Sequence, residues 1–433
     1  MTFPVVLQQF ILLLNSLVDR IWIAHIPDIG ELAFTASGIC VPIIYIVFAI
    51  TELVGTGIVP RVGWLLGQGD QNEAERTLGA FVLLDIILAS FIFIVFEAFT
   101  PQLVKLFGGD ELTSPLAITY LRIAAPGYAL NIVASGLTPF LLAEGRSKLA
   151  SSILGAGIGI NMLLDPILIF GFDLGITGAA LATTISGLTS TALAIGCILG
   201  NRDLHLQRSN MKLSWKLMRP CLAIGVTPMT LVLAETIQLG VYNHMLLRMG
   251  GDMTIGAMTL VVMLFDFFYF PVYGMAYGSQ PITSYNLGSG HSERVFANIR
   301  ILLGSTLVWS LVVWLVMVFL TTPVVSLVLG GGQLASYTAP LVRLSFIVFF
   351  MSTLQFVCQS TLQAMNRART TFILGLCRTV ILLIPLVLLM PRLFPGHAVQ
   401  SVFLAQPVVD VIVGIISFYI LHKCIAKIKT STI

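Results

Sequence analysis

A series of long apolar stretches constrains this chain more than any other feature. A segment of about 20 mostly apolar residues can cross the hydrocarbon core of a bilayer as a helix. Only 10% of the 433 residues are charged, against about a quarter in soluble domains, so the chain lacks the charge to cover a water-facing surface. The sequence therefore predicts an all-α integral membrane protein with twelve transmembrane helices, at residues 4–25, 34–58, 78–99, 117–142, 149–171, 176–199, 219–246, 254–280, 299–321, 337–362, 370–390 and 397–421.

The first apolar stretch is not typical of a signal peptide. It lacks a basic start and an A-x-A cleavage site, and Asp19 and Arg20 interrupt it. We therefore expect it to be the first spanning helix, with no soluble domain before it. The six cysteines are scattered through apolar stretches and form no C-x-x-C pair, so they indicate neither a metal site nor a disulfide framework.

The basic residues predict the orientation of the spans. If the N-terminus is inside, fifteen Lys and Arg residues lie on the cytoplasmic side and three on the opposite side, and five more lie within spans. Cytoplasmic loops carry the excess of Lys and Arg in membrane proteins. We therefore expect both termini to be cytoplasmic and the protein to be a multi-pass component of the cell (inner or plasma) membrane.

An internal repeat divides the chain into two halves. A shift of 221 residues places Gly57, Pro60, Leu66, Gly67 and Gly69 on Gly278, Pro281, Leu287, Gly288 and Gly290, and Arg122, Ala143 and Arg146 on Arg343, Ala364 and Arg367. Six spans separate the copies, so the halves have the same orientation and are related by a pseudo-two-fold axis along the membrane normal. We expect an N-lobe at 1–200, a cytoplasmic linker at 201–218 and a C-lobe at 219–433. A cavity between two such lobes is typical of transporters.

The fifth span holds the most informative polar pair. Asn161 and Asp165 are i and i+4 and share a helix face, Gly155 and Gly159 allow a close neighbour, and Pro166 cannot donate a backbone hydrogen bond. Asn15 and Asp19 share a face of the first span in the same way, and Thr183 in the sixth span is placed to face them. The 221-residue shift places Leu382 and Leu386 on Asn161 and Asp165. The pair is therefore not a requirement of the shared fold, and we expect a function in the N-lobe.

The expected chemistry of this pair is reversible binding of a small cation. Burial disfavours an ionised carboxylate, and a second carboxylate nearby adds to the effect, so the site can take up a proton near neutral pH. The same oxygens suit Na+. For the other intramembrane acids, notably Asp85, Glu97 and Asp410, we expect internal salt bridges. The arginines available to them are Arg20, Arg61, Arg122, Arg343 and Arg378.

The sequence resembles the multidrug and toxic compound extrusion (MATE) family over essentially its whole length. The resemblance rests on Pro4 to Asp19, LGQGD at 66–70, AEGRSK at 143–148, NMLLDPILIFG from Asn161, GITGAALAT at 175–183 and QPITSYNLGSG at 280–290. It implies two six-helix lobes, no cofactor, and export of cationic or amphipathic compounds driven by H+ or Na+. The closer similarity is to the DinF-like branch. There Asp19, Asn161, Asp165 and Thr183 would bind the coupling cation, and helix 1 would bend at Pro4.

Two departures from the family pattern concern acids and their neighbours. Arg20 stands where the family often has Thr and is able to perturb Asp19. A NorM-like C-lobe site needs acids on helices 7 and 10; Glu235 fits the first, but helix 10 offers Gln355. Asp266 on helix 8 is a second candidate cavity acid, beside an aromatic-rich stretch at 264–278 that is able to stack on planar cations or only to pack against lipid.

Other functions remain open from the sequence. A flippase for lipid-linked saccharides, from the same superfamily, would need a cavity lined by arginines. A channel or receptor fits the repeat and the one-sided acid pair less well. An enzyme fits least, because the sequence has no catalytic triad pattern, metal cluster or nucleotide loop. We expect a monomer that binds small molecules and lipid, and no nucleic acid.

Overall fold

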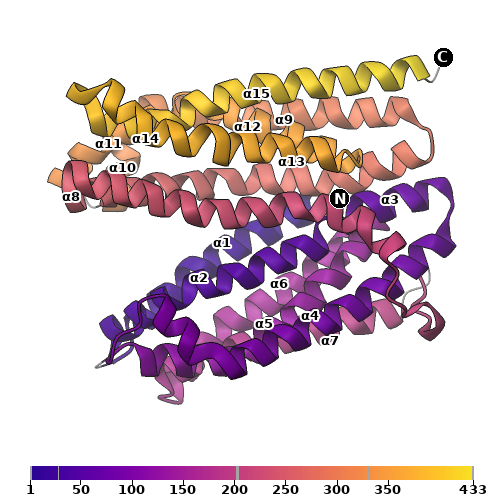
Figure 1. Ribbon diagram of the computed structural model, residues 1–433, viewed down its shortest axis with the longest axis horizontal. Coiled ribbons are helices and arrows are strands. Elements are labelled where there is room, and N and C mark those ends of the chain that lie inside the picture. The colour runs from indigo at the N-terminus through magenta and orange to yellow at the C-terminus, as the bar shows by residue number, and fades with distance from the viewer. Residues whose placement is uncertain (1, 28, 201–203, 330–331, 432–433) are drawn as a thin grey trace.

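The computed structural model describes residues 2–27, 29–200, 204–329 and 332–431, and most of them are helical (Figure 1). The first half forms α1 (Thr2–Ala24), α2 (Gly30–Gly55), α3 (Ile58–Gln68), α4 (Gln71–Leu106), α5 (Ser114–Ala143), α6 (Ser147–Pro166), which continues into a π-helical turn (Ile167–Gly171), and α7 (Gly175–Leu199). The second half forms α8 (Trp215–Gly288), α9 (Ser292–Phe319), α10 (Thr321–Leu329), α11 (Gln333–Phe346), α12 (Phe349–Ala364), α13 (Ala368–Leu376), a π-helical segment (Cys377–Leu383), α14 (Ile384–Leu393) and α15 (Ala398–Ser431).

Element α8 contains two membrane crossings. Its apolar spans are Trp215–Leu246 and Gly256–Gly288. Between them, the Thr254 hydroxyl donates to the Leu246 carbonyl oxygen at 2.8 Å. Eight residues of straight α-helix would separate these groups by about 12 Å. The chain therefore turns back on itself between the two spans.

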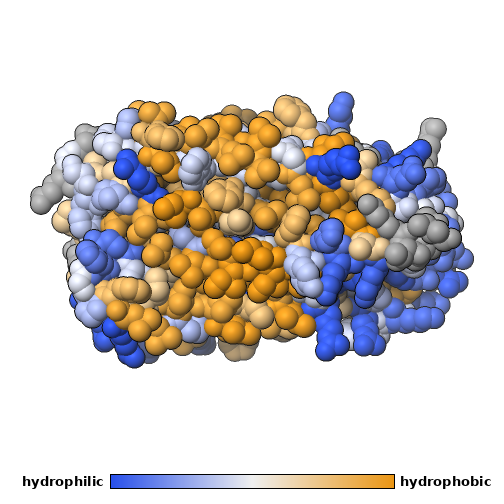
Figure 2. All heavy atoms as spheres, turned by 90° about the horizontal axis from the view of Figure 1, so that it is seen from above, coloured by the Kyte–Doolittle hydropathy of each residue, from blue (hydrophilic) through white to orange (hydrophobic). Residues whose placement is uncertain are grey.

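The predicted fold class is confirmed. Ten helical segments of the described chain are long and apolar enough to cross a membrane, and α11 with α12 makes an eleventh crossing bent by 46°. α1 is the twelfth segment; its described apolar run is Thr2–Asn15. Figure 2 shows the result as an apolar band between two hydrophilic ends.

The 221-residue repeat is visible in the backbone. Gly69 and Gly290 both end a helix in the left-handed region, at φ 79° and 76°, and Gly145 (φ 82°) is matched by Asn366 (φ 58°). Helices also start in register: Gln71 begins α4 and Ser292 begins α9, and α6 and α13 begin at residues 147 and 368. Glycine or asparagine suits these turns because few other residues tolerate positive φ.

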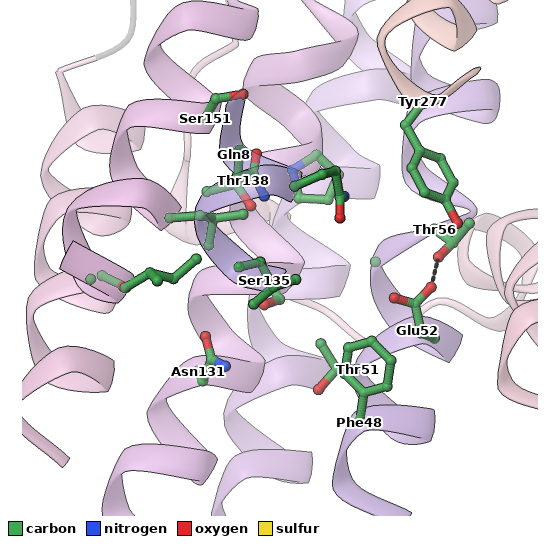
Figure 3. A pocket seen from close by; sticks show the side chains of 18 of the residues that line it. Gln8, Phe48, Thr51, Glu52, Thr56, Asn131, Ser135, Thr138, Ser151 and Tyr277 are labelled. Carbon is green, nitrogen blue, oxygen red and sulfur yellow. Dashed lines mark hydrogen bonds between the residues drawn. The ribbon is translucent and has the colours of Figure 1, made fainter. Parts of the chain in front are cut away.

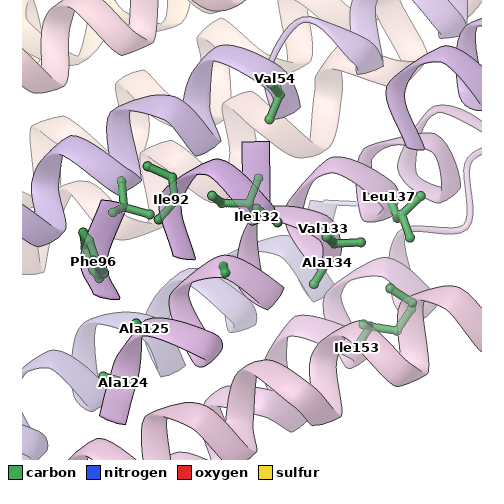
Figure 4. Close-up of a cluster of buried hydrophobic side chains, with 14 of the residues drawn as sticks. Val54, Ile92, Phe96, Ala124, Ala125, Ile132, Val133, Ala134, Leu137 and Ile153 are labelled. Atoms are coloured by element: carbon green, nitrogen blue, oxygen red, sulfur yellow. The ribbon is translucent and has the colours of Figure 1, made fainter. Parts of the chain in front are cut away.

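The buried apolar side chains form two separate clusters, one in each lobe. In the N-lobe, small and branched residues of α5 such as Ala125 and Ile132 pack against α2 and α4 (Figure 4). Leu204, Met218 and Cys221 also belong to this cluster, so the segment before α8 and its first turns pack on the N-lobe. The domain boundaries themselves stay a prediction.

The two lobes touch at the end of the molecule where α3 lies and α8 begins (Figure 1). There Gly57, Gly63 and Gly67 lie against Cys221, Ser284 and Tyr285. The Asn366 side-chain amide also donates to the Pro60 carbonyl oxygen at 3.2 Å. We call this set of residues the inter-lobe contact.

Candidate transport cavity

A cavity of about 650 Å³ lies between the lobes. α1, α2, α5, α6 and α7 of the N-lobe form most of its wall, and α8 and α12 contribute the C-lobe side. Figure 3 shows polar side chains pointing into it from several helices, among them Asn131, Ser135 and Glu52. A space of this size suits a small organic molecule.

Three of the four residues predicted for the cation site line this cavity: Asp19, Asn161 and Thr183. The fourth, Asp165, is fully buried directly behind Asn161. The Asn161 amide donates to Asp165 Oδ1 at 3.4 Å, as the i, i+4 spacing predicted. Asp19 is near enough to Asp165 for the two charges to interact. Helices far apart in sequence thus bring two carboxyl groups, an amide and a hydroxyl together.

Two oxygens in this region have no donor. Asp165 Oδ2 and Asn15 Oδ1 are buried and lack a hydrogen-bond partner among the described residues. A buried acceptor left unsatisfied costs about 1–3 kcal/mol. A proton or a hard cation would remove that cost, so the surroundings of Asp165 fit a cation that binds and leaves.

Neighbouring hydroxyl groups complete the polar wall. The hydroxyls of Tyr120 and Tyr128 on α5 are 3.3 Å apart, and both residues line the cavity. The Thr183 hydroxyl donates to the Ala179 carbonyl oxygen at 3.1 Å. Because this bond uses its proton, the Thr183 oxygen can offer only lone pairs to the cavity, as a cation ligand must.

Two expectations about helix 1, the effect of Arg20 and the bend at Pro4, stay predictions. The side chain of Arg20 lies outside the described part of the structure, so its effect on Asp19 stays a prediction. Pro4 lies in the first turn of α1, where a proline costs no helical hydrogen bond, and α1 runs on without a break to Ala24. All α1 residues that line the cavity, from Val5 to Asp19, follow Pro4. A bend at Pro4 would therefore leave their mutual arrangement unchanged.

Of the two C-lobe acids, Glu235 and Asp266, one is part of the described cavity wall. Glu235 lines the cavity. Asp266 is exposed and is not part of the described wall, but it shares a helix face with Tyr273 and Tyr277, which line the cavity. The role of Asp266 as a second cavity acid therefore stays a prediction. Gln355 is buried and donates to Gln359 at 2.6 Å, so no acid replaces it on α12.

The expected internal salt bridge is present for Asp410 and absent for Asp85 in the described part of the chain. Arg378 and Asp410 form a buried pair with N···O at 3.0 Å, as expected. Asp85 forms no ion pair among the described residues: both carboxyl oxygens are buried without a partner, and the side chain packs against Gly136. Glycine at 136 leaves room for the carboxyl group but offers it no donor.

The sequence interpretation missed part of the cavity wall. Glu52 on α2 and Tyr273, Tyr277 and Phe356 of the C-lobe line the cavity. The spacing of Tyr269, Tyr273 and Tyr277 at i, i+4 and i+8 indicated a single aromatic helix face. It did not show that the face points to the cavity rather than to lipid.

The described cavity wall is acidic. It holds Asp19, Glu52 and Glu235, and within the part of the chain that the structure describes it holds no Lys, Arg or His. Such a wall favours positively charged ligands and disfavours phosphates. A model of one protein family, MatE, matches residues 4–167 and 230–389, in both lobes. The chain belongs to the MATE family.

The relatives of this MATE protein have names that refer to different transported compounds. The FAD transporter of Shewanella oneidensis is 24% identical over all of this chain and 95% of its own. The multidrug export protein MepA of Staphylococcus aureus is 23% identical over 90% of this chain and 86% of its own. A solved structure described as the outward-facing conformation of a multidrug resistance MATE transporter matches 99% of this chain and 95% of its own, with a TM-score of 0.90 and 19% identity.

Proposed function

We propose that this MATE protein is a secondary antiporter that exports cationic or amphipathic compounds in exchange for H+ or Na+. Asp19 and Asp165 bind the coupling cation, and Asn161 and Thr183 orient or ligate it. The single observation that supports this most is the acidic cavity between the lobes, with a buried, unsatisfied Asp165 oxygen behind its wall. Cargo and cation are both attracted by the carboxylates of this one cavity, so the charge that one brings in disfavours binding of the other.

Alternating access gives this exchange a direction. The inter-lobe contact closes one end of the molecule, the end that we propose faces the cytoplasm because its loops carry most Lys and Arg. The lobes in this state therefore offer the cavity to the outer side. One proton entering along a 100 mV potential supplies about 2.3 kcal/mol, enough for a concentration gradient of some tens-fold in an uncharged cargo at about 1.4 kcal/mol per decade. Exchange of one proton for one monovalent cation moves no net charge, so the H+ gradient alone then drives it.

Transport by the purified protein in liposomes tests the proposal. Ethidium movement is followed under a pH gradient or a Na+ gradient, each imposed separately, for the wild type, Asp165→Asn and Glu97→Gln. Glu97 is an exposed carboxyl on α4 outside the described cavity wall. We expect one gradient to drive transport by the wild type and Glu97→Gln, and Asp165→Asn to lose it. Gradient-driven transport by Asp165→Asn at the wild-type rate would remove this residue from the mechanism.

The same acidic wall disfavours the anionic alternatives. A lipid-linked saccharide flippase must accommodate a pyrophosphate, and FAD, named in the Shewanella relative, carries one too. Placing a pyrophosphate against Glu52 and Glu235 would be unfavourable, because Arg378, the arginine that interacts with Glu235, is already paired with Asp410. FAD added to the liposome assay in place of ethidium decides between these cargoes: transport of FAD and not of ethidium would overturn the cationic assignment.

A further inference from the structure

Glu52 occupies a special place on the cavity wall. It lies one turn before α2 ends at Gly55. Its Oε2 accepts a hydrogen bond from the Thr56 hydroxyl at 2.6 Å, and both residues line the cavity (Figure 3). The bond fixes one carboxyl oxygen and leaves the other available to a ligand. Thr56 separates α2 from α3, the helix that carries much of the inter-lobe contact.

An aromatic wall from the other lobe stands near this carboxyl group. Tyr277 is close enough to interact with both Glu52 and Glu235. The Phe356 ring packs edge-on against Tyr273 at 4.8 Å and Tyr277 at 6.0 Å between ring centroids. These contacts hold the rings in place while all three side chains line the cavity. A cation is attracted to aromatic faces as well as to carboxylates.

This end of the cavity is well separated from the Asp19 region. Tyr273 flanks Gly274, and a methyl group on Gly274 would lie 2.4 Å from the Val6 Cα atom. Val6 and Asp19 are 13 residues apart on α1, which is about 20 Å along a helix. The charge interactions follow the same division: Asp19 acts on Asp165, whereas Arg378, Asp266 and Glu52 act on Glu235. The cavity thus contains two acidic regions, one toward each end.

We propose that Glu52 binds the positive charge of the cargo, and that with Glu235, Tyr273, Tyr277 and Phe356 it forms a site for organic cations with a planar aromatic ring system. The two carboxylates come from opposite lobes and both attract a cation placed between them, and the rings provide the apolar contact. The coupling cation then has the Asp19 region to itself. This inference rests on the proposed function. It adds which residues bind the cargo and to which class of compounds the cargo belongs.

The test uses two ligands that share a ring system. Ethidium is a permanent phenanthridinium cation, and phenanthridine is the uncharged parent ring. Binding of each to the purified full-length protein is measured by fluorescence for the wild type, Glu52→Gln, Glu52→Asp and the control Glu97→Gln. We expect Glu52→Gln to weaken ethidium binding by roughly tenfold to a hundredfold, as for loss of one charge-assisted contact. Phenanthridine binding should be unchanged, and Glu52→Asp should recover part of the ethidium affinity.

Each other outcome has a definite meaning. Equal loss of ethidium and phenanthridine in Glu52→Gln would show a packing role and overturn the inference, as would unchanged ethidium binding. If the wild type binds ethidium and Asp165→Asn abolishes its gradient-driven transport, the proposed function survives that failure. If the wild type neither binds nor transports ethidium, the proposed function fails, and this inference fails with it. A thermal melt of each variant shows whether the fold is intact.

Discussion

Gly67 on α3 lies so close to Tyr285 on α8 that a methyl group on it would be 2.1 Å from the Tyr285 carbonyl oxygen. Gly288 stands in the same relation to Trp64, also at 2.1 Å. The 221-residue shift maps Gly67 onto Gly288 and Trp64 onto Tyr285, so these are two copies of one contact. The inter-lobe contact is therefore built on the pseudo-two-fold axis and on glycines that let two backbones meet.

Gly67→Ala is expected to separate the lobes at this contact. The added methyl meets backbone atoms, which cannot rotate away as a side chain would. The buried Cys221 thiol, at the same contact, should become reactive to N-ethylmaleimide, measured by mass spectrometry of the labelled peptide, and ethidium export should fall. Gly304→Ala on α9 is the control, because nothing lies within 4 Å of its added methyl. Cys221 as protected in Gly67→Ala as in the wild type would contradict this role.

Thr183 and Thr184 are adjacent and should respond differently to replacement by valine. Thr183 lines the cavity, so Thr183→Val should raise the H+ or Na+ concentration needed for half-maximal export while leaving the melting temperature nearly unchanged. The Thr184 hydroxyl instead donates to the Ile123 carbonyl oxygen at 2.6 Å. Thr184→Val should keep the ion dependence and lose about 0.6 kcal/mol of stability, typical of one bond between membrane helices. The reverse pattern would place the ion site elsewhere.

The buried Arg378–Asp410 pair should depend on both of its members. Asp410→Asn leaves the guanidinium without its partner at 3.0 Å, and removing one member of a buried pair costs about 3–5 kcal/mol. The double variant Arg378→Met, Asp410→Leu removes both charges and should recover most of that loss. Thermal unfolding of the wild type, Asp410→Asn and the double variant measures these differences in stability. A double variant less stable than Asp410→Asn would show that the ion pair itself stabilises the C-lobe.

The sequence predicted well those features that follow from the cost of exposing polar groups to lipid. Helix positions followed from apolar length, and the lobes followed from glycines that the backbone requires, as at Gly69 and Gly290 with φ of 79° and 76°. The Asn161–Asp165 contact followed from helical spacing alone. Each of these inferences needs only local geometry or a repeat.

The sequence could not predict which face of a helix meets the cavity. Glu52 and Asp266 both looked like isolated acids in apolar spans, yet Glu52 lines the cavity and Asp266 is not part of its described wall. That difference depends on how each helix is rotated against its neighbours, which periodicity does not fix when a span is apolar all round. The salt bridge predicted for Asp85 was wrong for a related reason. The neighbour of Asp85 is Gly136 rather than an arginine.

The aromatic wall gives the last prediction. If Tyr277 holds the planar part of the cargo, Tyr277→Leu should weaken ethidium binding by roughly fivefold or more, as for loss of a cation–π contact. Tyr277→Phe should not, because it keeps the ring. Tetramethylammonium has no ring to stack but is also attracted to an aromatic face by its charge, so Tyr277→Leu should weaken its binding too, by a smaller factor than that of ethidium. Tyr419→Leu on α15, whose ring lies outside the described cavity wall beside Lys423 at 4.5 Å, is the control. Equal weakening by Tyr277→Phe and Tyr277→Leu would instead assign the contact to the tyrosine hydroxyl, and the ligand class would then be defined by a hydrogen bond rather than by an aromatic plane.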